Sequence, residues 1–363
     1  MRNLLILAAA LGLAGVANAQ NNAALNQSGT QNDASIEQTG FAHSAVIEQV
    51  GTTNSGAITQ EGTKGAGRSN VATLAQDGTS NEATISQSRA SDNTSGDNNT
   101  AVDQEGQQNT ADVRQTSRDT ETTIDQVGDR NTATVSQTGM NAAVIDIDQV
   151  GSQNEAIASQ DKGTGGMIGI DQDGTGNFAD VYQERENRQS PVRTMATVFQ
   201  EGTANRADVD QISSENASVD VSQFGDRNDA TVDQFNATEI DPNHQALVRQ
   251  DGTENVVVLD QSAAQVAAAN DAQIRQAGTS NMARLDQDGA EGGHTADIRQ
   301  DGVGNVLEGI GGAAFALQAG DGHALTVDQS GDMNRAQVSQ TGMGNTATFD
   351  QTGTGNTATV TQQ

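Results

Sequence analysis

The sequence of 363 residues has a composition that excludes most kinds of compact globular domain. Only 33% of its residues are hydrophobic and 2% aromatic, with no Trp, no Cys and one Tyr. A thick core is therefore not expected, because ordinary domains are nearer half apolar and fill their interiors with large aromatic side chains. The lack of Cys excludes disulfides, zinc–thiolate sites and a cysteine nucleophile. The formal net charge of −30 argues against nucleic acid as a partner. Either disorder or a thin repetitive fold remains, and periodicity must decide between them.

The first 19 residues read as a secretory signal peptide. Arg2 supplies a positive start, residues 4–16 are apolar, and Ala-Asn-Ala at 17–19 is a typical cleavage site, so the mature chain is expected to start at Gln20. An uncleaved membrane anchor is the alternative, although the apolar stretch is short for a bilayer. No later stretch is apolar enough to cross as a helix. We therefore predict an exported protein without integral membrane insertion.

Residues 20–363 repeat one short unit, Q-x-G-x-x-N-x-A-x-φ-x-Q, in which φ is Ile, Val, Leu or Phe. A clean copy runs from Gln126 to Gln137. Its second half alternates, with Asn131, Ala133 and Val135 on one parity and small hydroxyl residues on the other. Because side chains of a strand have a period of two, the first set is expected inward and the second in solvent. The Gly two residues after Gln predicts a tight turn with positive φ.

A second level of order groups these units in pairs. Fourteen glutamines, every second one in the series, are followed by Gly at +2 and Asn at +5, whereas most of the intervening turns carry insertions. At Gln300 the expected partner eleven residues on is replaced by Gly311, and an insertion is expected after it. Two strands therefore make one coil. We predict an all-β fold, a parallel β-solenoid of about 14 two-strand coils and 28 strands, amyloid-like and roughly 65 Å long.

The core of this solenoid is expected to be two facing rows of Ala and Ile or Val, closed by Gln and Asn. Identical amides stacked in register can hydrogen-bond along the stack, which satisfies groups that would be unfavourable if buried alone. No catalytic, cofactor-binding or metal-binding residues are predicted. The residues predicted to form the structural ladder are Gln27, Gly29, Asn32, Gln49, Gly51, Asn54, Gln76, Gly78, Asn81, Gln126, Gly128, Asn131, Gln200, Gly202, Asn205, Gln329, Gly331, Asn334, Gln351, Gly353 and Asn356.

The motif Q-x-G-x-x-N-x-A-x-x-x-Q, seen from Gln76 to Gln87 and from Gln329 to Gln340, resembles the curlin repeat of curli fibre subunits. The resemblance covers essentially the whole chain after residue 19. It implies a subunit of the extracellular functional amyloid of biofilms, exported through the periplasm and an outer-membrane pore and nucleated by a sister subunit. Familiar curli subunits are much shorter and carry a Gly-rich export segment, whereas here the first strand begins at Asn21. The chain therefore resembles a long divergent member, either main subunit or nucleator.

The first and last coils keep the full motif, at Gln27 and at Gln351. Solenoids that stay monomeric need polar caps over their open ends. None is evident in the sequence, so we predict that each end templates the next subunit in a head-to-tail homopolymer. The alternative is a monomeric secreted adhesin or ice-binding solenoid. Thr-Ala-Thr occurs at 132–134, 346–348 and 357–359, although these segments do not form a continuous array.

All four histidines, His43, His244, His294 and His323, stand at the Asn position of the looser strands. Substitution within the polar ladder is the simpler interpretation, and a metal or pH-sensitive site is the alternative. No Ser-His-Asp grouping, phosphate loop or HExxH motif is present, and we predict that the protein is not an enzyme.

Charged residues should form outward columns along the stack. Asp103, Asp125, Asp148 and Asp171 precede the Gln on four successive coils, and Arg249, Arg275 and Arg299 occupy the same column further on. Like charges about 5 Å apart repel, so we expect a solvated face that limits lateral association. Ca²⁺ bridging or an acid trigger of assembly is the alternative.

Overall fold

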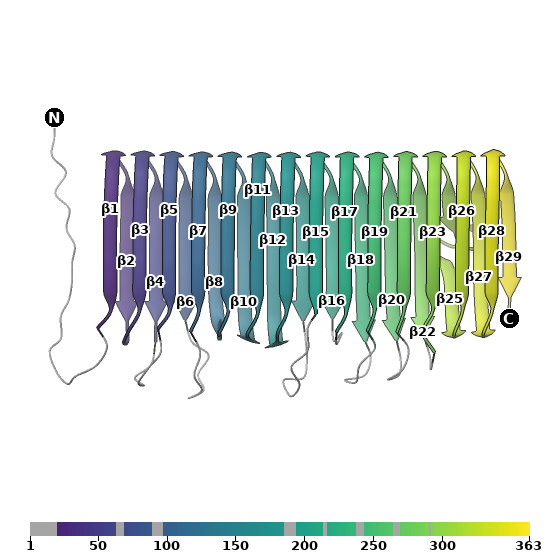
Figure 1. Cartoon of the computed structure of the whole chain (residues 1–363), viewed down its shortest axis with the longest axis horizontal. Helices are drawn as coiled ribbons and strands as arrows, with labels where there is room; N and C mark the ends of the chain where they lie inside the picture. Colours follow the sequence, from purple (N-terminus) through teal and green to yellow (C-terminus); the bar gives the residue numbers. More distant parts are fainter. Residues whose placement is uncertain are drawn as a thin grey trace.

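The computed structural model describes residues 20–62, 69–88, 97–184, 194–212, 216–236, 243–263, 269–289 and 292–363. These residues form an elongated stack of two-strand coils (Figure 1). Within these ranges there is no α-helix, and nothing that could span a membrane as a helix. The predicted signal peptide, residues 1–19, lies outside the described residues.

Two parallel sheets form the two broad faces of the stack. Sheet A has 14 strands and sheet B has 15, and the chain alternates between them. The strands of sheet A are β1 (Asn22–Thr30), β3 (Ser44–Thr52), β5 (Val71–Thr79), β7 (Asn99–Gln107), β9 (Glu121–Asp129), β11 (Val144–Ser152), β13 (Met167–Thr175), β15 (Met195–Thr203), β17 (Ser218–Asp226), β19 (Gln245–Thr253), β21 (Asp271–Thr279), β23 (Thr295–Val303), β26 (Ala324–Asp332) and β28 (Thr346–Thr354).

Sheet B lies behind sheet A and supplies the other half of each coil. Its strands are β2 (Asp33–Thr39), β4 (Ser55–Glu61), β6 (Glu82–Ser88), β8 (Thr110–Arg118), β10 (Thr132–Asn141), β12 (Glu155–Thr164), β14 (Phe178–Glu184), β16 (Arg206–Ile212), β18 (Asp229–Asn236), β20 (Val256–Ala263), β22 (Met282–Gly289), β24 (Val306–Glu308), β25 (Ala316–Asp321), β27 (Arg335–Met343) and β29 (Thr357–Gln362).

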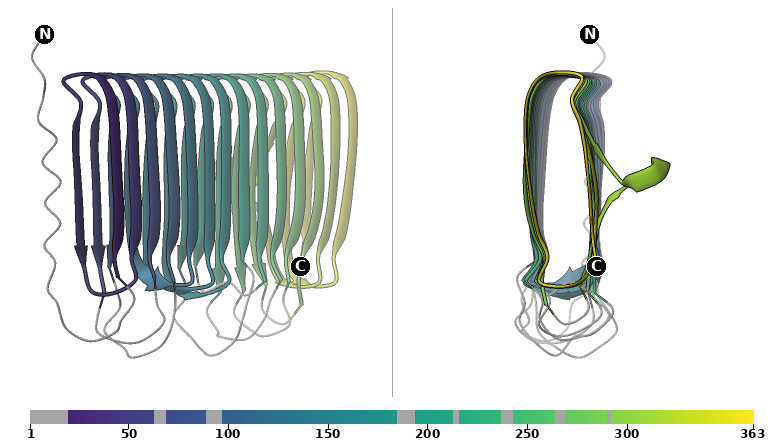
Figure 2. Two further views of the ribbon diagram at one scale, coloured as in Figure 1. Left: turned by 60° about the vertical axis from the view of Figure 1, so that its left-hand side comes forward. Right: turned by 90° about the vertical axis from the view of Figure 1, so that its right-hand side faces the viewer.

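Each strand pairs in register with the equivalent strand one coil further on. Between β1 and β3, for example, Gln27 lies beside Gln49 and Gly29 beside Gly51. Seen along the stack, the coils superpose closely (Figure 2). The predicted parallel β-solenoid with Gln and Asn ladders is therefore confirmed.

The core is a thin layer between the two sheets. The inward apolar side chains of most strands are one Ala-sized residue and one Ile, Val or Leu, such as Ala45 and Ile47, which are both fully buried. Burying an aliphatic side chain of this size contributes roughly 1.5–3 kcal/mol. At least one such residue on most strands, repeated along the stack, gives a continuous core in which Phe349 is the one aromatic side chain among the described buried hydrophobic residues. This arrangement explains how a chain with only 33% hydrophobic residues folds.

The turns that lead from sheet A to sheet B are uniform, and we call this side of the stack the uniform edge. In every coil the Gly two residues after Gln has a φ between 102° and 130°. The residue two positions later is also left-handed, with a φ between 54° and 70°, whether it is Gln31, Thr53, Arg130 or Gly176. The Gly position was predicted. The second left-handed residue was not, because no single residue type marks it.

The strand expected to end near Gly311 differs from the prediction. Its first part, β24, pairs with β22 and β27, and the chain then leaves the sheet at residues 309–315 before it resumes as β25. Figure 2 shows this excursion as a green arm beside the stack. Gln318, and not Gly311, therefore lies beside Gln287 and Gln340. The insertion interrupts a strand and does not lengthen a turn, which is why sheet B has 15 strands.

Candidate functional site

Two unbroken ladders of glutamine side chains run the length of the core. In sheet A each Gln Nε2 donates a hydrogen bond to Oε1 of the Gln in the next coil, from Gln27 to Gln351, over 2.7–3.0 Å. Sheet B carries the same ladder from Gln38 to Gln362. All these bonds point the same way, so the stack has a chemical direction.

The second hydrogen of the Gln amide bonds across the core at every interior Gln of sheet A and at most of those of sheet B. Gln49 Nε2, for example, donates to the Asp33 backbone carbonyl oxygen at 2.9 Å as well as to Gln76 Oε1 at 2.7 Å. Both N–H groups of the buried amide are thereby satisfied, which removes the penalty for burying it. The ladders link the two sheets and also link successive coils.

An asparagine ladder follows the uniform edge. Asn154 is typical: its Oδ1 accepts the backbone N–H of Asn177 in the next coil, and its Nδ2 donates to the carbonyl oxygens of Val150 and Gly174. The same backbone-to-Oδ1 bond joins Asn32 to Asn356 through every coil. Each Asn therefore closes its own turn and holds the turn of the following coil.

The glycines of this edge are required by contact as well as by φ. A Cβ on Gly151 would overlap the backbone carbonyl oxygen of Gly174 in the next coil. The interior members of the column behave alike, each meeting the carbonyl of the Gly above it. At Gly353, in the last coil, no described backbone lies in that position. The predicted ladder residues are thus brought together in three continuous columns, of Gln, Gly and Asn.

The opposite edge carries a mixed ladder, and we call it the variable edge. His43, His244, His294 and His323 lie on it, and Nδ1 of each accepts a backbone N–H from the next coil at 3.1–3.2 Å. Histidine thereby does what Asn Oδ1 does on the uniform edge, which confirms substitution within the polar ladder. An accepting Nδ1 is unprotonated, so these rings are neutral. Burial lowers the pKa of His244 to about 4.

The first and last coils expose groups that interior coils bury. Ala45 and Gln49 are fully buried, whereas their equivalents in the first coil, Ala23 and Gln27, are exposed and half-buried. At the other end Asn356 is exposed, although its interior equivalents lie in the core. Leu25, Ala34, Ile36, Ala358 and Val360 pack against the core but are only partly buried. Among the described residues, no strand pairs with the outer side of either end coil.

Comparison with known protein families identifies the repeat in part of this stack. The curlin associated repeat matches residues 118–144, 145–174 and 331–363. The chain therefore contains curlin repeats in these segments. The matched segments cover strands near the middle and at the end of the stack, and the same ladders continue through the coils between them. No match was found among curated proteins. The curlin-repeat family is structural and not enzymatic.

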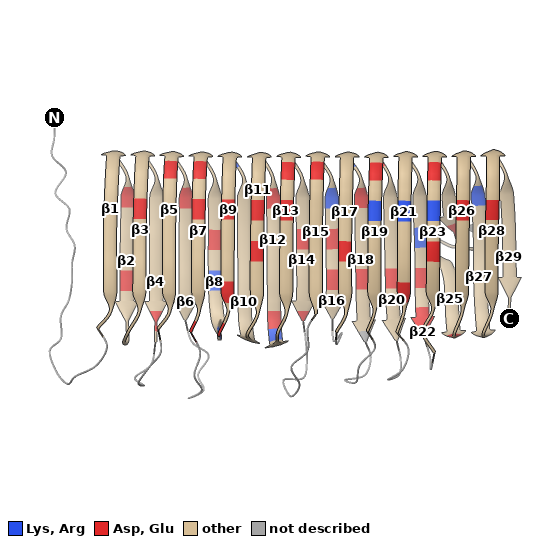
Figure 3. Cartoon of the chain, in the orientation of Figure 1, with Lys and Arg blue, Asp and Glu red and all other residues tan. Residues whose placement is uncertain are grey.

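Charged residues form columns on the outer face of the curlin-repeat stack. Asp103, Asp125, Asp148 and Asp171 lie in register on β7, β9, β11 and β13 (Figure 3). Partial burial raises the pKa of each of them, and neighbouring carboxylates raise it further. A second column, Asp210, Asp233, Asp260 and Asp286, runs along sheet B. Burial and the neighbouring Asp residues raise the pKa of Asp233 and Asp286 to about 6.

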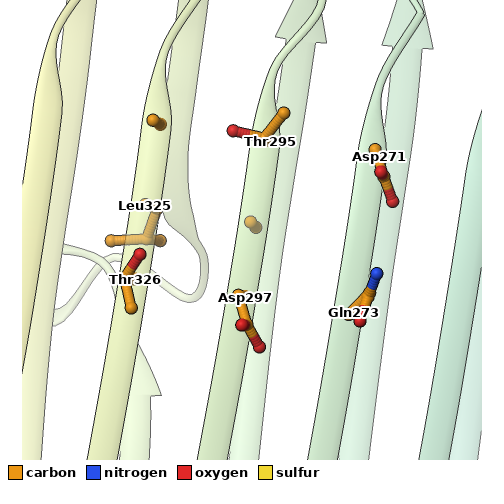
Figure 4. Close-up of a pocket in the computed structure, with 8 residues that line it drawn as sticks. Asp271, Gln273, Thr295, Asp297, Leu325 and Thr326 are labelled. Atoms are coloured by element: carbon orange, nitrogen blue, oxygen red, sulfur yellow. The ribbon is translucent and has the colours of Figure 1, made fainter.

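Neither the charged columns nor the surface hollow brings the described side chains together around a ligand-binding site. In the described part of the chain, no three His, Asp or Glu residues are placed to hold one metal ion. A shallow hollow of about 200 Å³ on sheet A is lined by Asp271, Thr295 and Asp297 among others, but these side chains lie side by side on the strand surface (Figure 4).

The threonines considered for ice binding lie on outer faces, but they do not make an array. Thr132 and Thr134 of β10 have Glu155 and Ile157 beside them on β12. Thr346 and Thr348 belong to β28 at the end of the stack. Because an ordered surface array would need the same residue on successive coils, the face is unsuited to this alternative.

Proposed function

We propose that this curlin-repeat protein is a structural subunit of an extracellular, curli-like amyloid fibre that grows by end-to-end stacking of its coils. The observation that carries the proposal is the complementarity of the two end coils. Every interior junction between coils uses one set of hydrogen bonds and contacts. Each end coil exposes the groups that would bond to the groups exposed by the other end coil.

The hydrogen-bonding groups at the two ends are opposite in kind. Gln351 and Gln362 use one N–H on the carbonyls of Arg335 and Thr346, and their second N–H points along the stack, where an interior Gln would meet the next coil. At the other end, Oε1 of Gln27 and Gln38 is in the position that accepts such a bond in interior coils. The last coil of one copy therefore fits the first coil of another, head to tail, in the register of the ladders.

The electrostatics of such a junction are also favourable. Stacking Gln351 on Gln27 would place Asp350 beside Asn26, and stacking Gln362 on Gln38 would place Thr361 beside Glu37. No acid would meet an acid. Interior junctions, in contrast, align Asp103 to Asp171 on successive coils. A junction between two copies would thus be less repulsive than these interior junctions.

The remaining parts of the proposal come from the family. The proposed route is secretion through the signal peptide at residues 1–19 and an outer-membrane pore, and the proposed partners are further copies of the chain and a nucleating sister subunit. Fibres of this kind serve as a biofilm matrix and in adhesion.

The glycine column provides a test at one end of the subunit. Gly353→Ala adds a methyl group that meets nothing within its own subunit, although a φ of 111° strains Ala in this last turn. In an added copy the methyl would also overlap the carbonyl of Gly29, as at every interior junction. We expect the variant to fold and to bind wild-type seeds, and then to block further growth, with elongation reduced at least tenfold. Thioflavin T fluorescence and electron microscopy report elongation, and far-UV circular dichroism reports folding.

Gly355→Ala is the matched control. Gly355 also has a positive φ, of 70°, but a Cβ there meets nothing, and Ala204 occupies the same turn position inside the stack. This variant should elongate like the wild type. Equal elongation by the folded Gly353→Ala and Gly355→Ala variants would overturn the end-stacking proposal.

A further inference from the structure

Two of the four ladder histidines lie on successive coils and are stacked on each other. Coils are numbered here by their sheet A strand, from β1 as coil 1 to β28 as coil 14. His294 stands in the turn that leads into coil 12, and His323 stands in the turn that leads into coil 13. Their ring centres are 5.0 Å apart and the ring planes differ by 4°. Both residues are buried, with 0% and 1% of their surface exposed.

Hydrogen bonds fix both rings in one neutral form. Nδ1 of His294 accepts the backbone N–H of His323, and Nδ1 of His323 accepts the backbone N–H of Asn345, each over 3.1 Å. On the other side of each ring, Nε2 of His294 lies 3.1 Å from the Asp288 carbonyl oxygen, and Nε2 of His323 lies 3.0 Å from that of Ala319. Because a carbonyl can only accept, Nε2 carries the proton in both rings. The pair thus links coils 12, 13 and 14 on the variable edge.

We propose that this stacked pair is an acid-sensitive joint, at which one proton on either ring opens the variable edge between coils 12 and 14. Protonated Nδ1 is a donor, and it would then face the backbone N–H of His323 or of Asn345. A buried N–H that loses its acceptor destabilises the fold. An Asn Oδ1 at the same place would keep its bond at any pH. The histidines therefore add a pH dependence that the uniform edge does not have.

The two rings cannot both be charged while they stay stacked. Two cations with centres 5.0 Å apart in a buried site repel strongly. Burial lowers the pKa of His294, and His323 lowers it further, whereas the bond to the Asp288 carbonyl and the charges of Asp288 and Asp321 act the other way. The unfolded chain protonates both rings below about pH 6.5. The folded pair binds fewer protons, so its stabilisation is complete above pH 6.5 and is lost as the pH falls through the folded pKa.

The remaining contacts of these turns keep the opening local. Asp288 and Asp321 are the charged residues that face the pair in the described part of the chain. Asp321 Oδ1 accepts the backbone N–H of Gly292 at 3.0 Å. Backbone bonds also run from the Gly322 N–H to the Gly292 carbonyl and from the Gly344 N–H to the Asp321 carbonyl. None of these bonds uses a histidine ring, so a proton loosens the edge without unfolding the whole stack.

The position of the pair directs this loosening to the last coil. Interior coils are held by neighbours on both sides, whereas coil 14 is held through coil 13 alone, because no described strand pairs with its outer side. Coil 14 should therefore open before any interior coil. One consequence rests on the proposed function: coil 14 is the coil that would meet the next subunit, so acid should also slow elongation. The outward Asp columns act in the opposite direction, because protonation relieves their mutual repulsion.

Thiol labelling measures the opening of coil 14 directly, because the chain has no Cys of its own. Ala347 on β28 is two residues after Asn345 and only 5% exposed. The full-length variant A347C is labelled, freshly refolded and unassembled, with a dithiodipyridine, which reacts with thiols in acid. Each rate is divided by the rate in urea at the same pH. This ratio should rise at least tenfold between pH 7.5 and pH 4.5.

A196C is the matched control for position. Ala196 has the same place on β15, in coil 8, and is fully buried. The turns that lead into coils 7, 8 and 9 carry Gly166, Thr194 and Ala217 where the pair has histidine. The labelling ratio of A196C should therefore stay constant, within about twofold, over the same pH range.

Replacing the histidines tests the cause. H294N/H323N in the A347C protein should abolish the acid-induced rise, because Asn fills the same place at Asn270 and Asn345 and does not titrate. H244N changes a ladder histidine whose next neighbour is Asn270, and it should leave the rise unchanged. Far-UV circular dichroism at pH 7.5 checks that the variants fold. A rise that persists in H294N/H323N, or that is equal at A347C and A196C, would overturn the proposal. Failure of fibre elongation would leave these measurements on unassembled protein unaffected.

Discussion

Both edges of the stack connect sheet A to sheet B, but they differ in how much sequence variation they tolerate. On the uniform edge every coil has the same Gly and the same Asn, and the Asn ladder is unbroken from Asn32 to Asn356. On the variable edge the equivalent positions hold Asn, His, Thr, Ala and Gly in turn, as at His43, Thr120 and Ala217. One continuous polar edge, together with the Gln ladders, is therefore sufficient to hold the coils in register.

On the variable edge, other side chains make the contacts where an Asn is lacking. Where Asn is lacking near coil 6, Met140 is buried, and the Ser117 hydroxyl donates to the Gln137 carbonyl while it accepts the Met140 backbone N–H. Such solutions differ from coil to coil, so insertions can enter here without disturbing neighbours. The uniform edge has no such freedom, because each of its turns is hydrogen-bonded to the next.

The largest difference between the edges should follow from adding one methyl group. Gly151→Ala should lower the free energy of unfolding by several kcal/mol, because the Cβ overlaps the Gly174 carbonyl and φ is 115°. Gly322→Ala on the variable edge should cost about 1 kcal/mol or less, since a Cβ there meets nothing and Ala42 and Ala142 already hold the same turn position with a positive φ. Urea unfolding of the freshly refolded proteins measures both. Equal losses would show that the edges are equivalent.

An insertion should also destabilise the stack much more at the uniform edge than at the variable edge. Three residues, Gly-Ser-Gly, placed after Ser152 interrupt the Gly and Asn columns and should destabilise the stack by several kcal/mol. The same three residues placed after Gly165 lengthen the turn between β12 and β13 on the variable edge, for which closure entropy predicts less than about 1 kcal/mol. Far-UV circular dichroism and urea midpoints distinguish these outcomes. Tolerance of the first insertion would contradict a continuous uniform edge.

The same contrast shows which parts of the fold could be predicted from sequence. Gln76, Gly78 and Asn81 recur at fixed spacing, so the coil, its ladders and the tight Gly turn were predictable. The left-handed position of Gln31 or Arg130 was not, because the turn imposes that conformation on any residue. The break within the strand around Gly311 was missed because an insertion inside a strand leaves the same motif spacing as an insertion in a turn.

Acid should affect the variable edge through its histidines. Burial lowers the pKa of His244 to about 4, below the ordinary value of 6.5, so its stabilisation is complete above pH 6.5 and is lost as the pH falls through 4. The loss amounts to about 3 kcal/mol at most. His244→Asn keeps an acceptor for the Asn270 N–H and should remove this pH dependence. Identical pH profiles of the urea midpoint for the two proteins would exclude His244 as the cause.

The smallest effect should come from the outer face, which belongs to neither edge. The folded pKa of Asp233 and Asp286 is about 6, above the ordinary 3.8, because of burial first and neighbouring carboxylates second. Their favourable contribution is therefore complete below about pH 4 and is lost as the pH rises through 6. Asp233→Asn with Asp286→Asn should raise the urea midpoint slightly at pH 7.5 and leave it unchanged at pH 4. A larger gain at pH 4 would contradict the assignment.

Fibre diffraction tests end-to-end stacking of these coils most directly. Aligned fibres of the full chain should give a meridional reflection at about 4.7–4.8 Å from strands perpendicular to the fibre axis. The subunit repeat along the same axis should be roughly 65 Å, because 14 coils make one subunit. Fibres without the strand reflection on the meridian, or with a subunit repeat unrelated to 14 coils, would contradict the account.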